Sequence, residues 1–265
     1  MNFDIFANLK KTPIVMGILN CTPDSFFDGG VRTSIDAQLR HCETMISEGA
    51  AIIDVGAFST RPGYSEVPEE EELQRLLPLV KQIRTQFPTI PLSVDTFRSA
   101  VVRRVFDETG TFVVNDISGG LYDEKMLKTC GELSLPYICM HLHDVTQSKT
   151  MIADMQQFFE QQIAEAHTCG IPQFILDPGF GFGKTIDQQY ELLNRLDEFA
   201  HFNVPVLVGI SRKSMIWKTL QCSPQEALNG TTILNTLALT KGAHILRVHD
   251  VKEAMECVKL KKAIW

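Results

Sequence analysis

Eight short runs of apolar residues alternate with amphipathic segments along this chain, and this alternation restricts its possible folds more than any other feature. Each run is nearly continuous in apolar residues, as expected of parallel strands that are buried on both faces. The runs occupy 13–20, 50–56, 91–96, 111–116, 136–141, 174–179, 204–209 and 244–250. Helical patterns lie between most of them, at 36–48, from Pro68 onward, and at 99–108, 152–167, 186–198, 231–240 and 251–261.

This order of elements predicts an α/β protein, a single-domain (β/α)8 TIM barrel that comprises residues 1–265. The alternative is a doubly wound open sheet, which usually carries a Gly-x-Gly-x-x-Gly turn after its first strand. Here the first run continues into NCTPDSFFDGG, which lacks that turn. No internal repeat, low-complexity segment or linker-like stretch indicates a second domain.

The composition favours a small ligand over a polyanion or a membrane. The formal net charge is −7, whereas non-specific nucleic-acid binding requires clustered Lys and Arg. No run reaches the roughly 18 apolar residues of a membrane span. The seven cysteines are scattered without C-x-x-C spacing, which favours reduced thiols over a disulfide framework. With Asp4 interrupting the N-terminal segment, a signal peptide is not expected, and we predict a cytoplasmic protein with no nucleic-acid or membrane partner.

Polar residues end almost every apolar run. A single one is ordinarily a turn former or a helix cap, but in a barrel all strand ends converge on one face, where catalytic groups lie. Carboxylates and amides there suit a flat heterocycle with N–H donors, and cationic groups suit a phosphate or carboxylate. The residues are Asn20, Asp54, Asp95, Asn115, Asp116, His141, Asp177, Arg247 and His249, with Lys213 shortly after the seventh run.

The glycine-rich segment DPGFGFGKT at 177–185 fails as a phosphate-binding P-loop, because Pro178 stands where that motif requires glycine. Its glycines instead predict a close approach of the backbone to a ligand. Two further segments, 21–30 and 59–68, are long for strand–helix connections and are predicted to form loops over the site.

Seven motifs in order resemble those of the dihydropteroate synthases. They are MGILNCTPDSFFDGG, DVGAFSTRPG, SVDT, VNDISGG, DPGFGFGKT, GISRKSM and RVHDV, and together they cover nearly the whole chain. The resemblance implies a (β/α)8 barrel that joins a pterin diphosphate to 4-aminobenzoate and releases pyrophosphate in folate synthesis. It further implies sulfonamide competition, a Mg²⁺ cofactor and a homodimer.

The resemblance also implies roles for individual residues. Asp95, Lys213, Arg247 and His249 would be catalytic. The pterin would be bound by Asp95, Asn115, Met140, Asp177, Gly181, Phe182 and Lys213. The diphosphate would be bound by Asn20, Arg61, Arg247 and His249, with Asn20 also contacting the metal. The aminobenzoate would be bound by Phe26, Thr60, Pro62, Phe182 and Ser211.

The implied reaction begins with loss of pyrophosphate, which leaves a cation on the pterin methylene; Asp95 stabilises this cation before the arylamine attacks. Two segments depart from the family pattern. At 54–60 the chain reads DVGAFST, where Gly-Glu or a similar pair often precedes the Ser-Thr. After the fifth run the chain reads MHLHDV, without the usual glycine and proline, so we expect a different loop there, centred on His143 and Asp144.

Three other functions compete with this reading. A metal-dependent hydrolase would use His141 and His143, which lie on one side of a strand, but such sites need further His or carboxylate ligands. A corrinoid methyltransferase shares the pterin-binding barrel but has no need for the cationic STRPG, SRK and RVH segments together. A pterin-binding homologue without synthase activity is disfavoured by Asn20, Arg61, Lys213 and His249.

Overall fold

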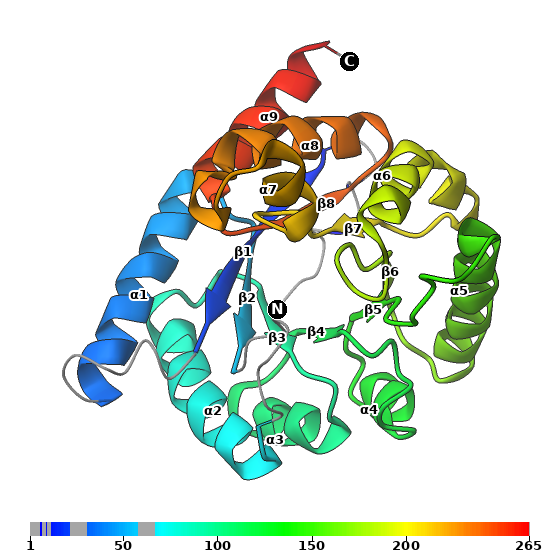
Figure 1. Cartoon of the computed structure of the whole chain (residues 1–265). Coiled ribbons are helices and arrows are strands. Elements are labelled where there is room, and N and C mark those ends of the chain that lie inside the picture. Colours follow the sequence, from blue (N-terminus) through cyan, green and yellow to red (C-terminus); the bar gives the residue numbers. More distant parts are fainter. Residues whose placement is uncertain (1–5, 7–8, 10–11, 22–30, 58–66, 265) are drawn as a thin grey trace.

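The computed structural model describes residues 6, 9, 12–21, 31–57 and 67–264, and within them eight parallel strands form a barrel (Figure 1). The sheet order is β6-β5-β4-β3-β2-β1-β8-β7, and a parallel bridge between Leu176 and Val206 joins its two edges. The strands are β1 (Ile14–Asn20), β2 (Ile52–Gly56), β3 (Leu92–Asp95), β4 (Val113–Asp116), β5 (Tyr137–Met140), β6 (Phe174–Asp177), β7 (Leu207–Val208) and β8 (Ile245–Val248).

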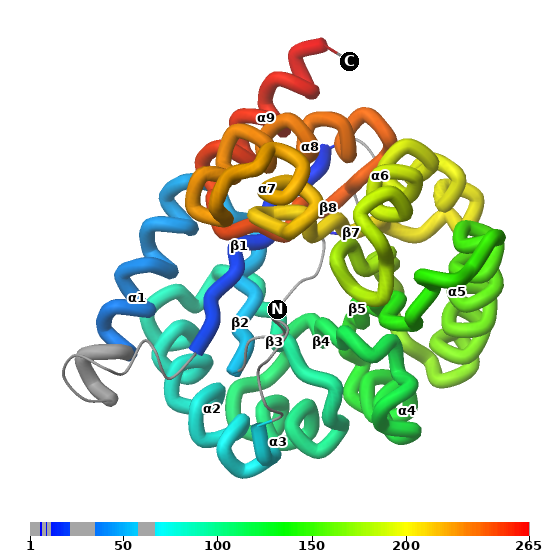
Figure 2. Tube along the Cα trace, viewed as in Figure 1, coloured from blue at the N-terminus to red at the C-terminus, as the bar shows by residue number. Residues whose placement is uncertain are grey.

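Helices surround the strands, and the chain passes around the barrel once in sequence order (Figure 2). Between β7 and β8 it forms two α-helices rather than one. The helices are α1 (Val31–Glu48), α2 (Glu69–Gln86), α3 (Ser99–Thr109), α4 (Met126–Glu132), α5 (Met151–Thr168), α6 (Ile186–Asn194), α7 (Ser214–Leu220), α8 (Leu228–Thr240) and α9 (Val251–Ile264). The predicted (β/α)8 barrel is therefore confirmed.

Several predicted elements differ from the observed ones. The short helices α4 and α7 were not expected, because seven residues are too few to show a clear helical period. The helix predicted at 186–198 ends at Asn194, and a 3₁₀ helix, η3 (Leu196–Phe202), follows. Leu196 and Phe199 are buried at a spacing of three residues, which matches the three-residue turn of a 3₁₀ helix.

Alternation along the strands divides the apolar residues into two cores. Residues such as Val15, Ile53, Val114 and Leu176 face outward and pack under the helices. A second set faces the barrel axis and forms a separate cluster, to which two residues of the N-terminal segment also belong. Its members are Phe6, Leu9, Met16, Ile52, Val113, Ile138, Ile175, Leu207 and Ile245.

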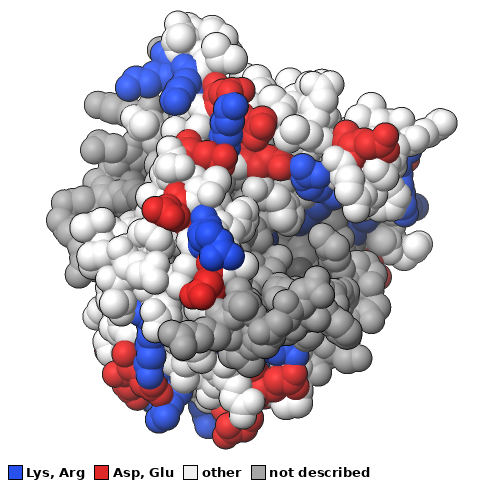
Figure 3. All heavy atoms as spheres, turned by 90° about the vertical axis from the view of Figure 1, so that its left-hand side faces the viewer, with Lys and Arg blue, Asp and Glu red and all other residues white. Residues whose placement is uncertain are grey.

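The exterior is mixed in charge. On the side shown in Figure 3, Lys and Arg lie among Asp and Glu, and neither sign forms one broad patch. Within the described part of the chain, no helix is both long and apolar enough to cross a membrane.

Candidate functional site

A narrow pocket lies at the carboxyl ends of the strands. Two residues beyond the inward-facing Ile52, Val113, Ile138, Ile175 and Ile245, the two-residue period of a strand again directs side chains toward the axis. Four of these positions carry polar or charged groups, Asp54, Asn115, Asp177 and Arg247, and the fifth carries the apolar Met140. The pocket is lined by Asp95, Asn115, Ile117, Met140, Asp177, Phe182, Gly209, Lys213 and Arg247.

Arg247 on β8 connects the polar groups at one side of this pocket. Its Nε donates to Asp54 Oδ2 at 2.7 Å, and its Nη2 donates to Asp95 Oδ2 at 2.9 Å. Asn115 Nδ2 also donates to Asp54 Oδ2, at 3.1 Å. The network thereby fixes Asp95, Asn115 and Arg247 relative to one another across four strands.

The same network has capacity left for a ligand. Oδ1 of Asp95 and Oδ1 of Asp54 are buried and accept no hydrogen bond from any described residue. A buried carboxylate oxygen without a donor is costly, so a bound molecule that brings a donor to it would be stabilised there. Asp95 lines the pocket, and its Oδ1 is suited to an N–H donor of a bound heterocycle.

Burial and neighbouring charges set the proton affinities of this network. Burial raises the pKa of Asp95 to about 7, although Arg247 acts in the opposite direction. Burial alone would lower the pKa of Arg247, but Asp54 and Asp95 outweigh it, and the pKa of this guanidinium is raised. Arg247 is therefore a permanent cation between two acidic side chains.

Asp177 and Lys213 also line the pocket. Asp177 Oδ1 accepts from the backbone N–H of Gly179 at 2.8 Å. Lys213 Nζ donates to the carbonyl of Phe180 and lies 4.6 Å from the centre of the Phe182 ring. Burial lowers the pKa of Lys213 to about 8, against the influence of Asp177, and burial raises the pKa of Asp177.

The rim carries the remaining described candidates. Ser211 Oγ and His249 Nδ1 lie 3.0 Å apart, and the backbone N–H of His249 donates to Ser211 Oγ at 3.2 Å. Asn20 ends β1 with an exposed side chain, paired in register with Gly56. Gly181 has a positive φ of 84°, and a Cβ atom there would lie 3.1 Å from Lys213 Cδ, so the loop packs directly on this lysine.

Two polar residues at strand ends face away from the pocket. Asp116 accepts from Ser118 N, Ser118 Oγ, Gly120 N and Tyr137 Oη, at 2.7 to 2.9 Å. The His141 ring packs against Phe158, with 5.1 Å between ring centres, and its Nδ1 lies 3.4 Å from Lys184 Nζ. Burial, with a contribution from Lys184, lowers the pKa of His141 to about 3. A neighbouring ammonium group disfavours a metal cation at this histidine.

The sequence-based assignments extend beyond the described residues at four positions, namely Phe26, Thr60, Arg61 and Pro62. Conversely, the structure adds three residues to which the sequence assigns no binding role. Ile117 and Gly209 line the pocket, and Asp54 belongs to its hydrogen-bond network. From the sequence, Asp54 is only a polar residue near the end of a strand. Gly209 lies in the GISRKSM motif, and a Cβ atom there would lie 3.9 Å from Lys213 Nζ and 4.0 Å from Arg247 Cβ, so a side chain at this position would enter the pocket.

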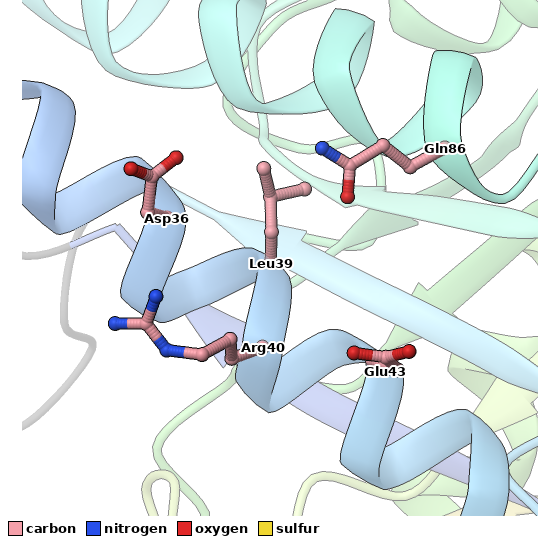
Figure 4. A pocket seen from close by; sticks show the side chains of 5 residues that line it. All are labelled: Asp36, Leu39, Arg40, Glu43 and Gln86. Carbon is pink, nitrogen blue, oxygen red and sulfur yellow. The ribbon is translucent and has the colours of Figure 1, made fainter.

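A second hollow lies on the outside of the barrel, between α1 and α2 (Figure 4). Asp36, Leu39, Arg40 and Glu43 of α1 and Gln86 of α2 line it. It shares no residue with the pocket at the strand ends, and apart from Leu39 its side chains are polar or charged and largely exposed. It is therefore not part of the candidate site.

The sequence of this chain is similar to those of known pterin binding enzymes. Residues 16–249 match the family model of pterin binding enzymes. The dihydropteroate synthase of Escherichia coli K12 is 44% identical over 260 residues, covering 95% of this chain and 91% of that protein.

Two solved structures share the whole fold. The dihydropteroate synthase of Clostridium difficile, determined in the presence of pteroic acid, superposes with a TM-score of 0.92 at 39% identity and covers 97% of this chain and 98% of its own. The Xanthomonas albilineans enzyme with 4-aminobenzoic acid has a TM-score of 0.89 at 36% identity and covers 96% of this chain and 93% of its own. On the family match and this full-length similarity, the chain belongs to the dihydropteroate synthase family of pterin binding enzymes.

Proposed function

We propose that this chain condenses 6-hydroxymethyl-7,8-dihydropterin diphosphate with 4-aminobenzoate to give 7,8-dihydropteroate and pyrophosphate. The observation that supports this most is the buried Asp95 carboxylate, which is paired with Arg247 through one oxygen and keeps its other oxygen for a ligand. A pterin offers ring N–H and amino donors that match such an acceptor.

The pterin ring would lie in the pocket at the strand ends. Asp95 and Asp177 would accept hydrogen bonds from its edge, Asn115 would bind the edge through its amide, and Lys213 would donate to a ring acceptor. Met140 and Phe182 would contact its faces, since both line the pocket with apolar surface. Gly181 would let the β6–α6 loop approach closely enough for Lys213 to reach the ring.

The diphosphate would lie toward the rim. Arg247 and His249 would bind its oxygens and stabilise the negative charge that develops on the leaving group. Arg61, outside the described residues, would add a second guanidinium there.

Among the described residues, Asn20 offers a side-chain oxygen that could serve as a ligand of a magnesium ion. Mg²⁺ takes one or two protein oxygens and completes its coordination with water and substrate phosphates, and the exposed amide of Asn20 provides such an oxygen. When bound, the ion would neutralise charge on the diphosphate. Among the described residues, no group of three or more His, Cys, Asp and Glu side chains is arranged to hold a metal without substrate.

The chemistry would proceed in two steps on the pterin methylene. The C–O bond to the diphosphate breaks, and its electron pair leaves with pyrophosphate, so the methylene carbon becomes cationic. The Asp95 carboxylate stabilises this cation. The nitrogen of 4-aminobenzoate then forms the new C–N bond and releases a proton.

The aminobenzoate would bind at the rim beside Ser211 and Phe182, with Phe26, Thr60 and Pro62 completing its site. Excluding water there protects the cation from hydrolysis. A sulfonamide is expected to compete at this position.

We further propose that the whole chain acts as one domain, as a homodimer in the cytoplasm. Support for the dimer comes from apolar side chains on α8 and α9 that are exposed in the single chain. Ile233 and Leu237 of α8 are 52% and 47% exposed, and Leu260 and Ile264 of α9 are 65% and 68% exposed. Sedimentation velocity tests this directly, and a monomer at micromolar concentration would contradict it.

The activity is tested by incubating the purified chain with pterin diphosphate, 4-aminobenzoate and Mg²⁺ while following pyrophosphate release with a coupled assay. We expect pyrophosphate and dihydropteroate in equal amounts. Pterin binding without either product would instead identify a binding protein that lacks synthase activity. A stoichiometric transition metal in the substrate-free protein would favour a metal-dependent hydrolase.

A further inference from the structure

Lys184 is a buried lysine on the outer side of the glycine-rich loop that follows β6. Only 7% of the residue is exposed. Its Nζ donates to three backbone carbonyls: that of Phe182 at 3.0 Å, that of Gly179 at 3.1 Å and that of His141 at 3.3 Å. An ammonium group has three N–H donors, and these carbonyls can occupy all three, with His141 Nδ1 a more distant neighbour at 3.4 Å.

This arrangement differs from that of an ordinary buried lysine. Burial disfavours an ammonium group unless an opposite charge or several dipoles compensate for the lost water. Within the described structure no carboxylate forms an ion pair with Lys184, and its compensation comes from carbonyl dipoles. An apolar side chain in the same space would leave these three carbonyls without the donors that Lys184 provides.

The carbonyls that Lys184 binds belong to the loop that contacts Lys213. On the pocket side of that loop, Lys213 donates to the carbonyl of Phe180 and lies over the ring of Phe182. Carbonyls 179 and 182 are thus held by one lysine and carbonyl 180 by the other. The backbone at 179–182 is fixed from both sides.

Lys184 also joins this loop to the one that follows β5. Through the His141 carbonyl it contacts the end of β5, and Val145 N donates to the Gly183 carbonyl at 2.8 Å. Gly179 has a φ of 71°, and a Cβ atom there would lie 2.2 Å from the His141 carbonyl oxygen. The two loops are therefore in close backbone contact, and Lys184 supplies the polar link between them.

We propose that Lys184 is a positioning residue for the pterin site. Lys184 does not line the pocket. It fixes the 179–182 backbone, which holds Phe182 in the pocket wall and the Phe180 carbonyl in contact with Lys213. This inference rests on the proposed function, because the consequence of losing Lys184 is expected in pterin binding.

Lys184→Met tests the proposal, since methionine keeps the length of the side chain and removes its donors. We expect kcat/KM for pterin diphosphate to fall about 100-fold, the scale of a displaced binding group. The KM for pterin diphosphate and the Kd of the pterin, measured by calorimetry, should both rise. Neither constant depends on how much of the preparation is folded, so a purely structural role would leave both unchanged. Lys128→Met, at an exposed position on α4, is the matched control and should leave both constants unaltered.

Chemical rescue gives a second test. In Lys184→Ala, n-propylammonium replaces the missing atoms of the side chain and should restore part of the pterin affinity, whereas n-propanol should not. An unchanged KM and Kd in Lys184→Met, or equal rescue by propanol, would overturn the proposal. Inactivity of the wild-type chain that nevertheless binds pterin would instead contradict the proposed function.

Discussion

Asp95 and Asp116 end neighbouring strands, and both are buried, yet their hydrogen bonding differs completely. Asp116 faces outward and accepts four hydrogen bonds from the turn after β4 and from Tyr137. Asp95 faces the barrel axis, accepts from Arg247 through one oxygen, and has no described donor for the other. The protein itself satisfies Asp116, as expected of a structural acid, whereas Asp95 lines the pocket and its Oδ1 can accept from a ligand.

The same contrast separates the buried Lys184 from the half-buried Lys213 on the two sides of the glycine-rich loop. Lys184 has all three donors occupied by backbone carbonyls, while Lys213 has one described hydrogen bond and lines the pocket. Structural groups and binding groups thus lie close together in this protein. They are divided by the alternation of side chains along the strands and by the two sides of one loop.

The largest expected effect comes from Lys213→Ala. It removes a pocket donor, and we expect kcat/KM to fall about 1000-fold, the range seen when one preorganised donor is lost. The fold should survive, because Lys213 is only half-buried and its surroundings already disfavour the charged form, lowering its pKa to about 8. Steady-state kinetics and circular dichroism check this, with the exposed Lys218→Ala on α7 as control. Near-normal turnover would remove Lys213 from the binding groups.

Asp116→Asn should show the opposite behaviour. The amide would present N–H donors to groups that themselves donate, so we expect a loss of about 3 kcal/mol in the free energy of unfolding. The KM of the molecules that remain folded should not change. Urea denaturation measures the first quantity and initial rates measure the second. A raised KM for pterin diphosphate would show that the outward-facing acid also acts in binding.

The pH dependence of pterin binding sharpens the comparison further. With the pKa of Asp95 raised to about 7, the carboxylate forms only as the pH rises through that value; with the pKa of Lys213 lowered to about 8, its charge is lost above it. Affinity should therefore be greatest between about pH 7 and 8. Calorimetry across this range checks the profile, and Lys213→Ala should abolish its alkaline limb.

Asp95 should also affect stability in the ligand-free protein. Its folded pKa lies above the ordinary value of 3.8, so the folded chain holds this proton more tightly than the unfolded chain. The contribution to stability is present below about pH 4 and is lost as the pH rises to about 7. Asp95→Asn should flatten this slope in urea denaturation, and an unchanged slope would assign it to other groups.

The smallest effect is expected at Asp144, in the loop after β5, where the sequence predicts a departure from the family pattern. Asp144 Oδ1 accepts from Thr146 N at 2.9 Å and Thr146 Oγ1 at 2.7 Å, and it is exposed. Asp144→Ala should lower the melting temperature slightly, by less than Asp116→Asn does, without changing kinetics. A change in KM would show that this loop takes part in substrate binding.

Much of the barrel could be predicted from the sequence, because parallel strands that are buried on both faces appear as uninterrupted runs of apolar residues. The site was less accessible. The contact between Asp54 and Arg247 joins residues 193 positions apart, and no local pattern indicates such a pairing. The adjacent Asn115 and Asp116 are also equivalent as polar strand ends. Only the barrel, with Val113 on its axis, shows which of them faces the pocket.

The short elements failed for a related reason. The helices α4 and α7 each span seven residues, so packing between neighbouring strands and helices decides them rather than periodicity. In the sequence, Lys184 is only one residue of the segment 177–185, which does not match the P-loop motif. Its carbonyl partners come from two loops that meet in space, so its role emerges from the tertiary structure alone.

The most direct test of this account is the affinity of Asp95→Asn for the pterin, measured together with its free energy of unfolding at pH 8. The asparagine oxygen can still accept from Arg247, and the neutral amide avoids the cost of ionising a buried acid, so we expect stability no lower than that of the wild type. Because the vacant carboxylate oxygen is replaced, we expect a loss of affinity of about 100-fold, as for a hydrogen bond to a charged group. Retained affinity with a large loss of stability would contradict the claim, since it would make Asp95 a structural acid like Asp116.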